Sequence, residues 1–128
     1  REPVSPFGTE ESFSPVLARR LRVEAQAGFP GGLDEIEVFG PKGVNLARTA
    51  RLRVSSTRVA EGNPTAYEAR RLNDGVYDQR WFPEGNQAAW IELEWDQPQS
   101  ITRVVWSTDR LKAFQGKFQQ NTVSQYRL

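Results

Sequence analysis

The sequence WIELEW at residues 90–95 decides the fold class. Apolar residues alternate with acidic ones there, a period of two that indicates a half-buried β-strand. The preceding loop, LNDGVYDQRW at residues 72–81, contains Asn-Asp-Gly, which favours a tight turn because glycine adopts positive φ without strain. The same loop concentrates carboxylate and carbonyl oxygens, the ligands that calcium prefers. We therefore expect an acidic loop, followed by a strand that begins with tryptophan, to organise the fold.

Similar patterns predict strands elsewhere in the chain, separated by turns rich in Gly, Pro, Asn and Asp. A turn at residues 96–99 is expected to separate the 90–95 strand from the next one. Residues 1–16 contain three prolines and are expected to form an irregular lead-in. The sequence thus predicts an all-β fold, an antiparallel β-sandwich or jelly roll, over residues 17–128. The other expected strands lie at residues 17–27, 34–39, 52–56, 101–106 and 124–128.

Composition narrows the classes of function. The 128 residues are enough for one domain with a real core. The chain has no Cys and no His, which excludes disulfides, Cys-zinc sites and any Ser-His-Asp or Cys-His mechanism within it. We therefore expect no enzymatic activity, with a carboxylate-pair glycosidase using Asp74 and Asp78 as the enzyme alternative.

Charge and hydropathy point away from nucleic acid and from a membrane span. The formal net charge is +1, so no global field attracts the chain to nucleic acid. Arginines cluster at residues 19–22, 48–53 and 70–71, and alternating arginines on a strand are expected to form its solvated face. No apolar run approaches the roughly 20 residues of a membrane-spanning helix.

The chain contains the motif Asn45-Leu46-Ala47, an Asp74-Gly75 turn in a loop that ends in Trp81, and the tryptophan-led strand at residues 90–95. With other short motifs, these resemble the galactose-binding-like β-sandwiches: discoidin, or coagulation factor V/VIII type C, domains and family 32 carbohydrate-binding modules. The family's closing motifs correspond to residues 18–22 and 35–40, which stand here before its opening motif. Either the domain is circularly permuted, which we favour, or the chain holds the end of one module and most of the next. Permuted segments of this kind resemble those of large secreted planctomycete-type proteins. The other motifs are Val54-Ser55-Ser56 and the strand at 101–106.

The resemblance implies a structural calcium ion beneath the binding loops. Its ligands would be the carboxylates of Glu35 and Asp74, with backbone carbonyls of Asp34 and Leu72. The alternative is that Asp74 only caps its own turn and that Glu35 is solvated.

The resemblance also implies a glycan-binding rim of loops. A sugar site needs an aromatic platform and planar hydrogen-bonding groups. The expected protein is a non-catalytic carbohydrate-binding or adhesion module of a larger extracellular or cell-envelope protein. The alternative is a structural protein-interaction domain or an accessory subunit of a larger assembly. The candidate ligand-binding residues are Arg71, Tyr77, Phe82, Arg110 and Phe114.

Overall fold

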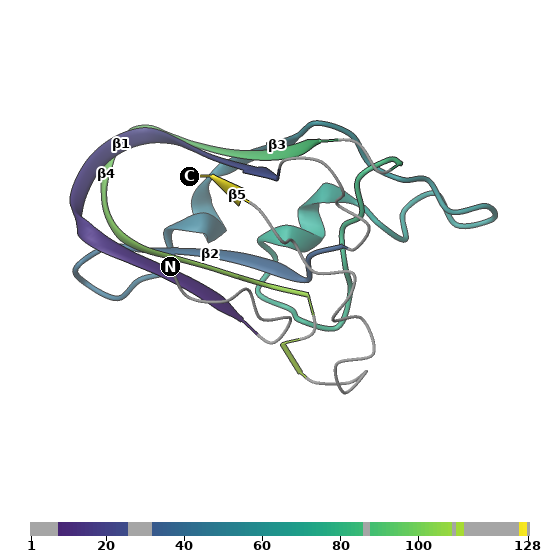
Figure 1. Cartoon of the computed structure of the whole chain (residues 1–128), viewed down its shortest axis with the longest axis horizontal. Coiled ribbons are helices and arrows are strands. Elements are labelled where there is room, and N and C mark those ends of the chain that lie inside the picture. Colours follow the sequence, from purple (N-terminus) through teal and green to yellow (C-terminus); the bar gives the residue numbers. More distant parts are fainter. Residues whose placement is uncertain (1–7, 26–31, 86–87, 109, 112–125, 128) are drawn as a thin grey trace.

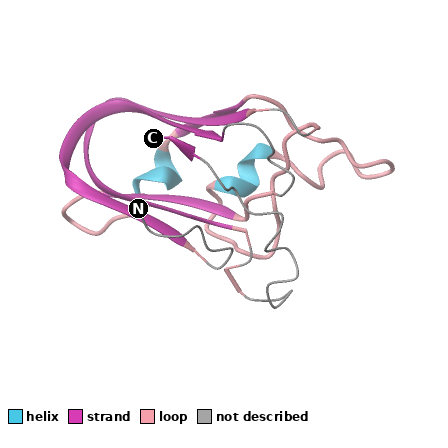
Figure 2. Cartoon of the chain, in the orientation of Figure 1, coloured by secondary structure: helices cyan, strands magenta, loops and turns pink. Residues whose placement is uncertain are grey.

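A computed structural model describes residues 8–25, 32–85, 88–108, 110–111 and 126–127. Within these residues the protein is all-β: strands of a mostly antiparallel sheet are accompanied by short 3-10 helices (Figures 1 and 2). The predicted fold class is confirmed at this level. The elements are β1 (Thr9–Ala25), β2 (Glu35–Phe39), η1 (Leu46–Thr49), β3 (Arg51–Val54), η2 (Ala69–Leu72), β4 (Ala89–Ser107) and β5 (Tyr126–Arg127).

The strand β4 is the centre of the sheet. β1 pairs along most of one edge of β4, and the opposite edge is shared by β3, at residues 91–94, and β2, at residues 103–107. β5 pairs with the far edge of β1 at Glu24 and Ala25. Among the described residues the sheet is open, with the order β2-β4-β1-β5 and β3 beside β4.

The long strands β1 and β4 curve together, so that the sheet folds back over itself (Figure 1). Two irregularities in their register account for the bend, because extra residues on one strand curve it. β1 pairs Ala18 with Gln99 and Arg20 with Glu94, so residues 95–98 of β4 oppose Arg19 alone. The two arms that result face each other: β3 belongs to one, the β3 arm, and β2 to the other, the β2 arm.

The structure corrects two predicted boundaries. Residues 96–99, expected to form a turn, lie inside β4, because the bulge opposite Arg19 absorbs the change of direction. Residues 9–16, expected in an irregular lead-in, belong to β1, because Thr9 to Ser12 pair with residues 103–106. Pro15 is tolerated since it lies at the second irregularity, between Ser12 and Val16, where no regular ladder bond is lost.

The core is built around three buried tryptophans. Trp81, Trp95 and Trp106 bury their indole rings, and a buried indole N–H requires a hydrogen-bond acceptor. Trp95 Nε1 donates to the Leu46 carbonyl at 2.8 Å, and Trp81 Nε1 donates to the Ser56 carbonyl at 3.1 Å. Aliphatic side chains of both arms complete this core. Its largest members include Ile36, Leu72, Trp81, Ile91, Leu93, Trp95, Ile101, Val104 and Trp106.

The segment after β2 folds directly back onto it. Asn45 Oδ1 accepts hydrogen bonds from the backbone N–H groups of Ala47 and Val38, both at 3.1 Å. Asn45 thereby caps η1 and attaches it to β2, with an isolated bridge to Phe39. The family-like closing strand and opening motif therefore lie in one body, as a circularly permuted domain requires. The permutation itself stays a prediction.

Candidate functional site

The strand β2 is buried on both faces, and its two faces differ in chemistry. Ile36 and Val38 belong to the core. Glu35 and Glu37, which share the other face, are covered by the loop at residues 73–80. Gly75 N donates to Glu35 Oε2 at 2.7 Å. We call this region the acidic loop site. It comprises Asp34, Glu35, Glu37, Arg48, Ser107, Arg110 and the loop at residues 73–80.

Glu35 is the most unusual residue of the site. Its side chain has no exposed surface, and Glu35 Oε1 has no hydrogen-bond partner in the described part of the chain. Burial, with smaller contributions from the neighbouring Asp74 and Glu37 carboxylates, raises the pKa of Glu35 to about 8, although the Gly75 N–H and Arg48 oppose this shift. A buried carboxylate oxygen is costly unless it is paired or coordinates a cation. The folded chain avoids this cost at pH 7 because the Glu35 carboxyl keeps its proton.

The other predicted metal ligands differ from Glu35 in their surroundings. Asp74 lies close enough to influence the Glu35 carboxylate, but its own Oδ1 accepts the Val76 N–H at 2.9 Å. Leu72 ends η2 just before the loop, with its side chain fully buried. The described residues contain no group of three or more acidic side chains arranged to hold a metal. A cation here would need backbone carbonyls beside Glu35, a donor set that calcium accepts.

Asp34 is fully buried and connects β2 to the end of β4. Its carboxylate accepts hydrogen bonds from Ser107 Oγ and, at 2.8 Å, from the backbone N–H of Arg110. Burial raises the pKa of Asp34, although these hydrogen bonds oppose the shift. The Asp34 side chain therefore has a structural role, and the predicted metal role concerns its carbonyl alone.

Two of the predicted ligand-binding residues, Tyr77 and Arg110, come together at the site. The Arg110 guanidinium lies 4.9 Å from the centroid of the Tyr77 ring. Both reach Glu37: Arg110 Nη2 donates to Oε1 at 2.6 Å, and the Tyr77 hydroxyl donates to Oε2 at 3.2 Å. Burial, followed by the Glu37 carboxylate, raises the pKa of Tyr77. The result is an aromatic ring, a guanidinium and a carboxylate in one partly exposed cluster.

The remaining predicted residues make other contacts. The Phe82 ring packs edge-on against Tyr67, with centroids 4.7 Å apart, and the Arg58 guanidinium lies 5.3 Å from the Phe82 centroid. Arg71 Nε is buried without a partner among the described residues. Phe114 lies outside the described residues.

Sequence reasoning missed Glu37, Arg48 and Ser107 as members of the site. Glu37 carried a signal, because residues two apart on a strand share a face and Glu35 was already a candidate. Arg48 carried none: its guanidinium packs where a side chain on Gly75 would lie, and only the folded chain brings them together.

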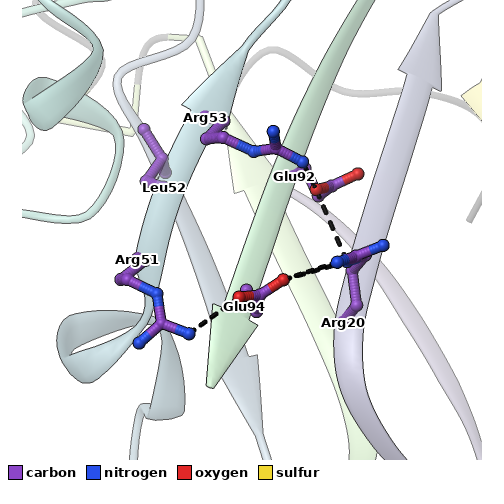
Figure 3. A pocket seen from close by; sticks show the side chains of 6 residues that line it. All are labelled: Arg20, Arg51, Leu52, Arg53, Glu92 and Glu94. Carbon is purple, nitrogen blue, oxygen red and sulfur yellow. Dashed lines mark hydrogen bonds and ion pairs between the residues drawn. The ribbon is translucent and has the colours of Figure 1, made fainter. Parts of the chain in front are cut away.

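A second charged region lies on the outer side of the β3 arm (Figure 3). The register places Arg20 and Arg51 on either side of Glu94, and Arg22 and Arg53 on either side of Glu92. We call these six residues the Arg–Glu face. The four arginine side chains are 41–64% exposed, which confirms the solvated face predicted for them.

Comparisons with known proteins give no match: no protein-family model, no curated protein and no solved structure is significantly similar to this chain. Among the described residues, no helix has the length and apolar character needed to cross a membrane.

Proposed function

We propose that the protein is a non-catalytic carbohydrate-binding or adhesion module of a larger extracellular or cell-envelope protein. The observation that carries the proposal is the loop at residues 73–80. The loop covers Glu35, whose Oε1 is buried and has no hydrogen-bond partner among the described residues. It also brings Tyr77 beside Arg110 at Glu37, two positions further along β2.

The fold proposed for this module is a β-sandwich of the jelly-roll type, circularly permuted. The curled sheet supports it, because the two arms face each other across one apolar core (Figure 1). The contact of Asn45 with β2 supports the permutation, because the proposed junction between the family's ends is short and well bonded.

A structural calcium ion is part of the proposal. Glu35 Oε1 would supply the carboxylate ligand, and the carbonyls of Asp34 and Leu72 with Asp74 would complete the set. Calcium would neutralise the buried charge of Glu35 and hold the loop on β2. The role of these residues is to shape the loop on which Tyr77 is presented.

The chemistry of the rim suits a sugar better than a reaction. A pyranose offers an apolar face for an aromatic ring and hydroxyls for planar charged groups, and Tyr77, Arg110 and Glu37 provide both. Of the alternative catalytic pair, Asp74 and Asp78, Asp74 accepts a hydrogen bond within its own turn, and Glu35 beside it has no exposed surface. Both features favour binding over a carboxylate-pair glycosidase.

A glycan array followed by isothermal titration with the full chain tests the proposal. We expect Tyr77→Ala to weaken binding of the retained sugar at least about tenfold, as loss of a central aromatic contact does. Arg70→Gln, on an exposed arginine of η2, is the matched control and should bind normally. An array on which no sugar is retained, or binding that ignores Tyr77→Ala, would contradict the proposal.

One observation favours the alternative, a protein-interaction domain. Val16 and Leu17 on β1 are 52% and 73% exposed, beside an apolar hollow of about 330 Å³ that Phe13, Leu21 and Ile101 help to line. Changing Val16 and Leu17 together to Asp would then abolish association with the parent assembly and leave sugar binding unchanged.

A further inference from the structure

The Arg–Glu face combines two rows of charges across three strands. In one row, Glu94 accepts from Arg20 Nη2 and Arg51 Nη2, each at 2.7 Å. In the other, Glu92 Oε2 accepts from Arg22 Nε at 3.3 Å, and Glu92 Oε1 accepts from Arg53. Arg20 Nε also lies 3.5 Å from Glu92 Oε1 and thereby links the rows. All of these residues except Arg22, together with Leu52, line a hollow of about 440 Å³ (Figure 3).

The two signs of charge lie at different depths on this face. The side chains of Glu92 and Glu94 are 6% and 30% exposed, whereas that of Arg53 is 64% exposed. Four arginines and two glutamates leave two positive charges on the six residues. Asp96 and Glu24 pair with Arg51 and Arg22 at the ends of the rows and balance these two charges. Between the ends, the guanidiniums of Arg20 and Arg53 lie nearer the solvent than the Glu92 carboxylate, so the outermost charges there are positive.

Arginine donors remain for a ligand on this face. A guanidinium has five N–H donors, and Arg53 uses Nη2 alone for Glu92 in the described part of the chain. Arg20 directs Nε and Nη2 towards the glutamates. The guanidiniums of Arg20 and Arg53 converge on the same carboxylate oxygen from opposite sides (Figure 3). Their other N–H groups can bind an oxyanion bidentately.

We propose that the Arg–Glu face is a second binding site, for an acidic polysaccharide, whose sulfate or carboxylate groups are bound between Arg20 and Arg53. Nucleic acid fits less well, because single strands bind by stacking bases on aromatic rings, and none of the residues that line the hollow is aromatic. A lipid surface fits less well too, because Leu52 is the one apolar residue in that lining, whereas binding in a membrane interface needs an apolar face.

Titration of the full chain with dextran sulfate and with polygalacturonate tests the proposal and separates sulfate from carboxylate recognition, with neutral dextran as the blank. We expect binding of at least one polyanion that weakens as salt is raised. The double variant Arg20→Gln/Arg53→Gln should weaken binding about tenfold or more, because it removes the two guanidiniums between which the anionic group is bound. Arg70→Gln should change it less than about twofold, since an exposed charge away from the site contributes little.

Asp96→Asn gives a test in the opposite direction. Asp96 is 84% exposed and pairs with Arg51, so its neutralisation should tighten binding about two- to threefold without unfolding the chain. The site does not depend on the proposed loop function, and Glu35→Gln should bind the polyanion normally. The proposal is overturned if neither polyanion binds, if Arg70→Gln weakens binding as much as the double variant, or if single-stranded DNA binds more tightly than both.

Discussion

Glutamates in two regions of this molecule have opposite environments. On the Arg–Glu face, hydrogen bonds from Arg51 and then Arg20 lower the pKa of Glu94 to about 2. At the acidic loop site, burial raises the pKa of Glu35 to about 8, and Glu35 Oε1 has no partner within the described residues. Both residues lie on strands of the same sheet, and they differ in whether the fold supplies a cation.

The charges of Glu92 and Glu94 are compensated by arginines of the same sheet, whereas the fold supplies no such compensation for a charge on Glu35 within the described residues. Glu92 and Glu94 are surrounded by guanidiniums on neighbouring strands, and their charges help to fix the strand register. Glu35 accepts one backbone hydrogen bond and lies near two further acids. Because an uncompensated buried charge is destabilising, Glu35 stays protonated at pH 7, and a cation would have to compensate its charge when it ionises.

The largest expected effect comes from removing the residue that holds the loop site in place. Trp81 is fully buried, and its backbone exchanges two hydrogen bonds with Leu33, just before β2. Trp81→Ala should lower the free energy of unfolding by about 3–5 kcal/mol, as loss of a buried aromatic side chain does. Chemical denaturation followed by circular dichroism measures this. A loss no larger than that for Arg51→Gln would show that Trp81 does not hold the loop site.

Glu35→Gln should have an intermediate effect that depends on pH. Because the pKa of Glu35 is raised on folding, the folded state keeps this proton between pH 4.5 and about 8 while the unfolded chain loses it. Stability therefore falls as pH rises through this range. In chelator, Glu35→Gln should be more stable than the natural chain at pH 8, by about 1–3 kcal/mol, and nearly equal to it at pH 4.5. Thermal unfolding of both proteins at pH 8 and at pH 4.5 measures this. A natural chain that is more stable than Glu35→Gln at pH 8 would contradict the prediction.

The smallest effect is expected on the Arg–Glu face, where the sign of the pH dependence is opposite. The pKa of Glu94 is lowered on folding, so its contribution is present above pH 4.5 and is lost as pH falls towards about 2. Arg51→Gln should lower the Tm by no more than about 2 °C at pH 7, because exposed ion pairs contribute little. The difference between variant and natural chain should shrink further at pH 2. A Tm difference that grows on acidification would contradict this assignment.

The parts that sequence could predict are those set by local pattern. Alternation in residues 90–95 places Ile91, Leu93 and Trp95 in the core and Glu92 and Glu94 on the opposite face of the strand, where they meet the arginines. The turn expected at residues 96–99 was wrong, because Pro98 and its neighbours bend a continuous strand when an irregular partner runs beside them. That outcome depends on β1, which is distant in sequence.

The candidate site was predictable only in part, for a similar reason. Glu35 and Asp74 are adjacent to motifs that can be read directly, and the fold places them within electrostatic reach of each other. The pairing of Tyr77 with Arg110 depends on how the end of β4 meets β2 through Asp34 and Ser107. No local sequence pattern predicts this contact between the end of β4 and β2. Phe82, chosen for its position in the sequence, packs with Tyr67 instead.

Calorimetric titration of calcium into the full chain at pH 7, in two buffers of different ionisation enthalpy, tests the central claim that Glu35 is a cation ligand. We predict one ion bound per chain with release of about one proton, because Glu35 must lose its proton to coordinate. Magnesium should bind more weakly, and Glu35→Gln should bind no calcium. Absence of binding to the natural chain, or equal binding by Glu35→Gln, would contradict the claim.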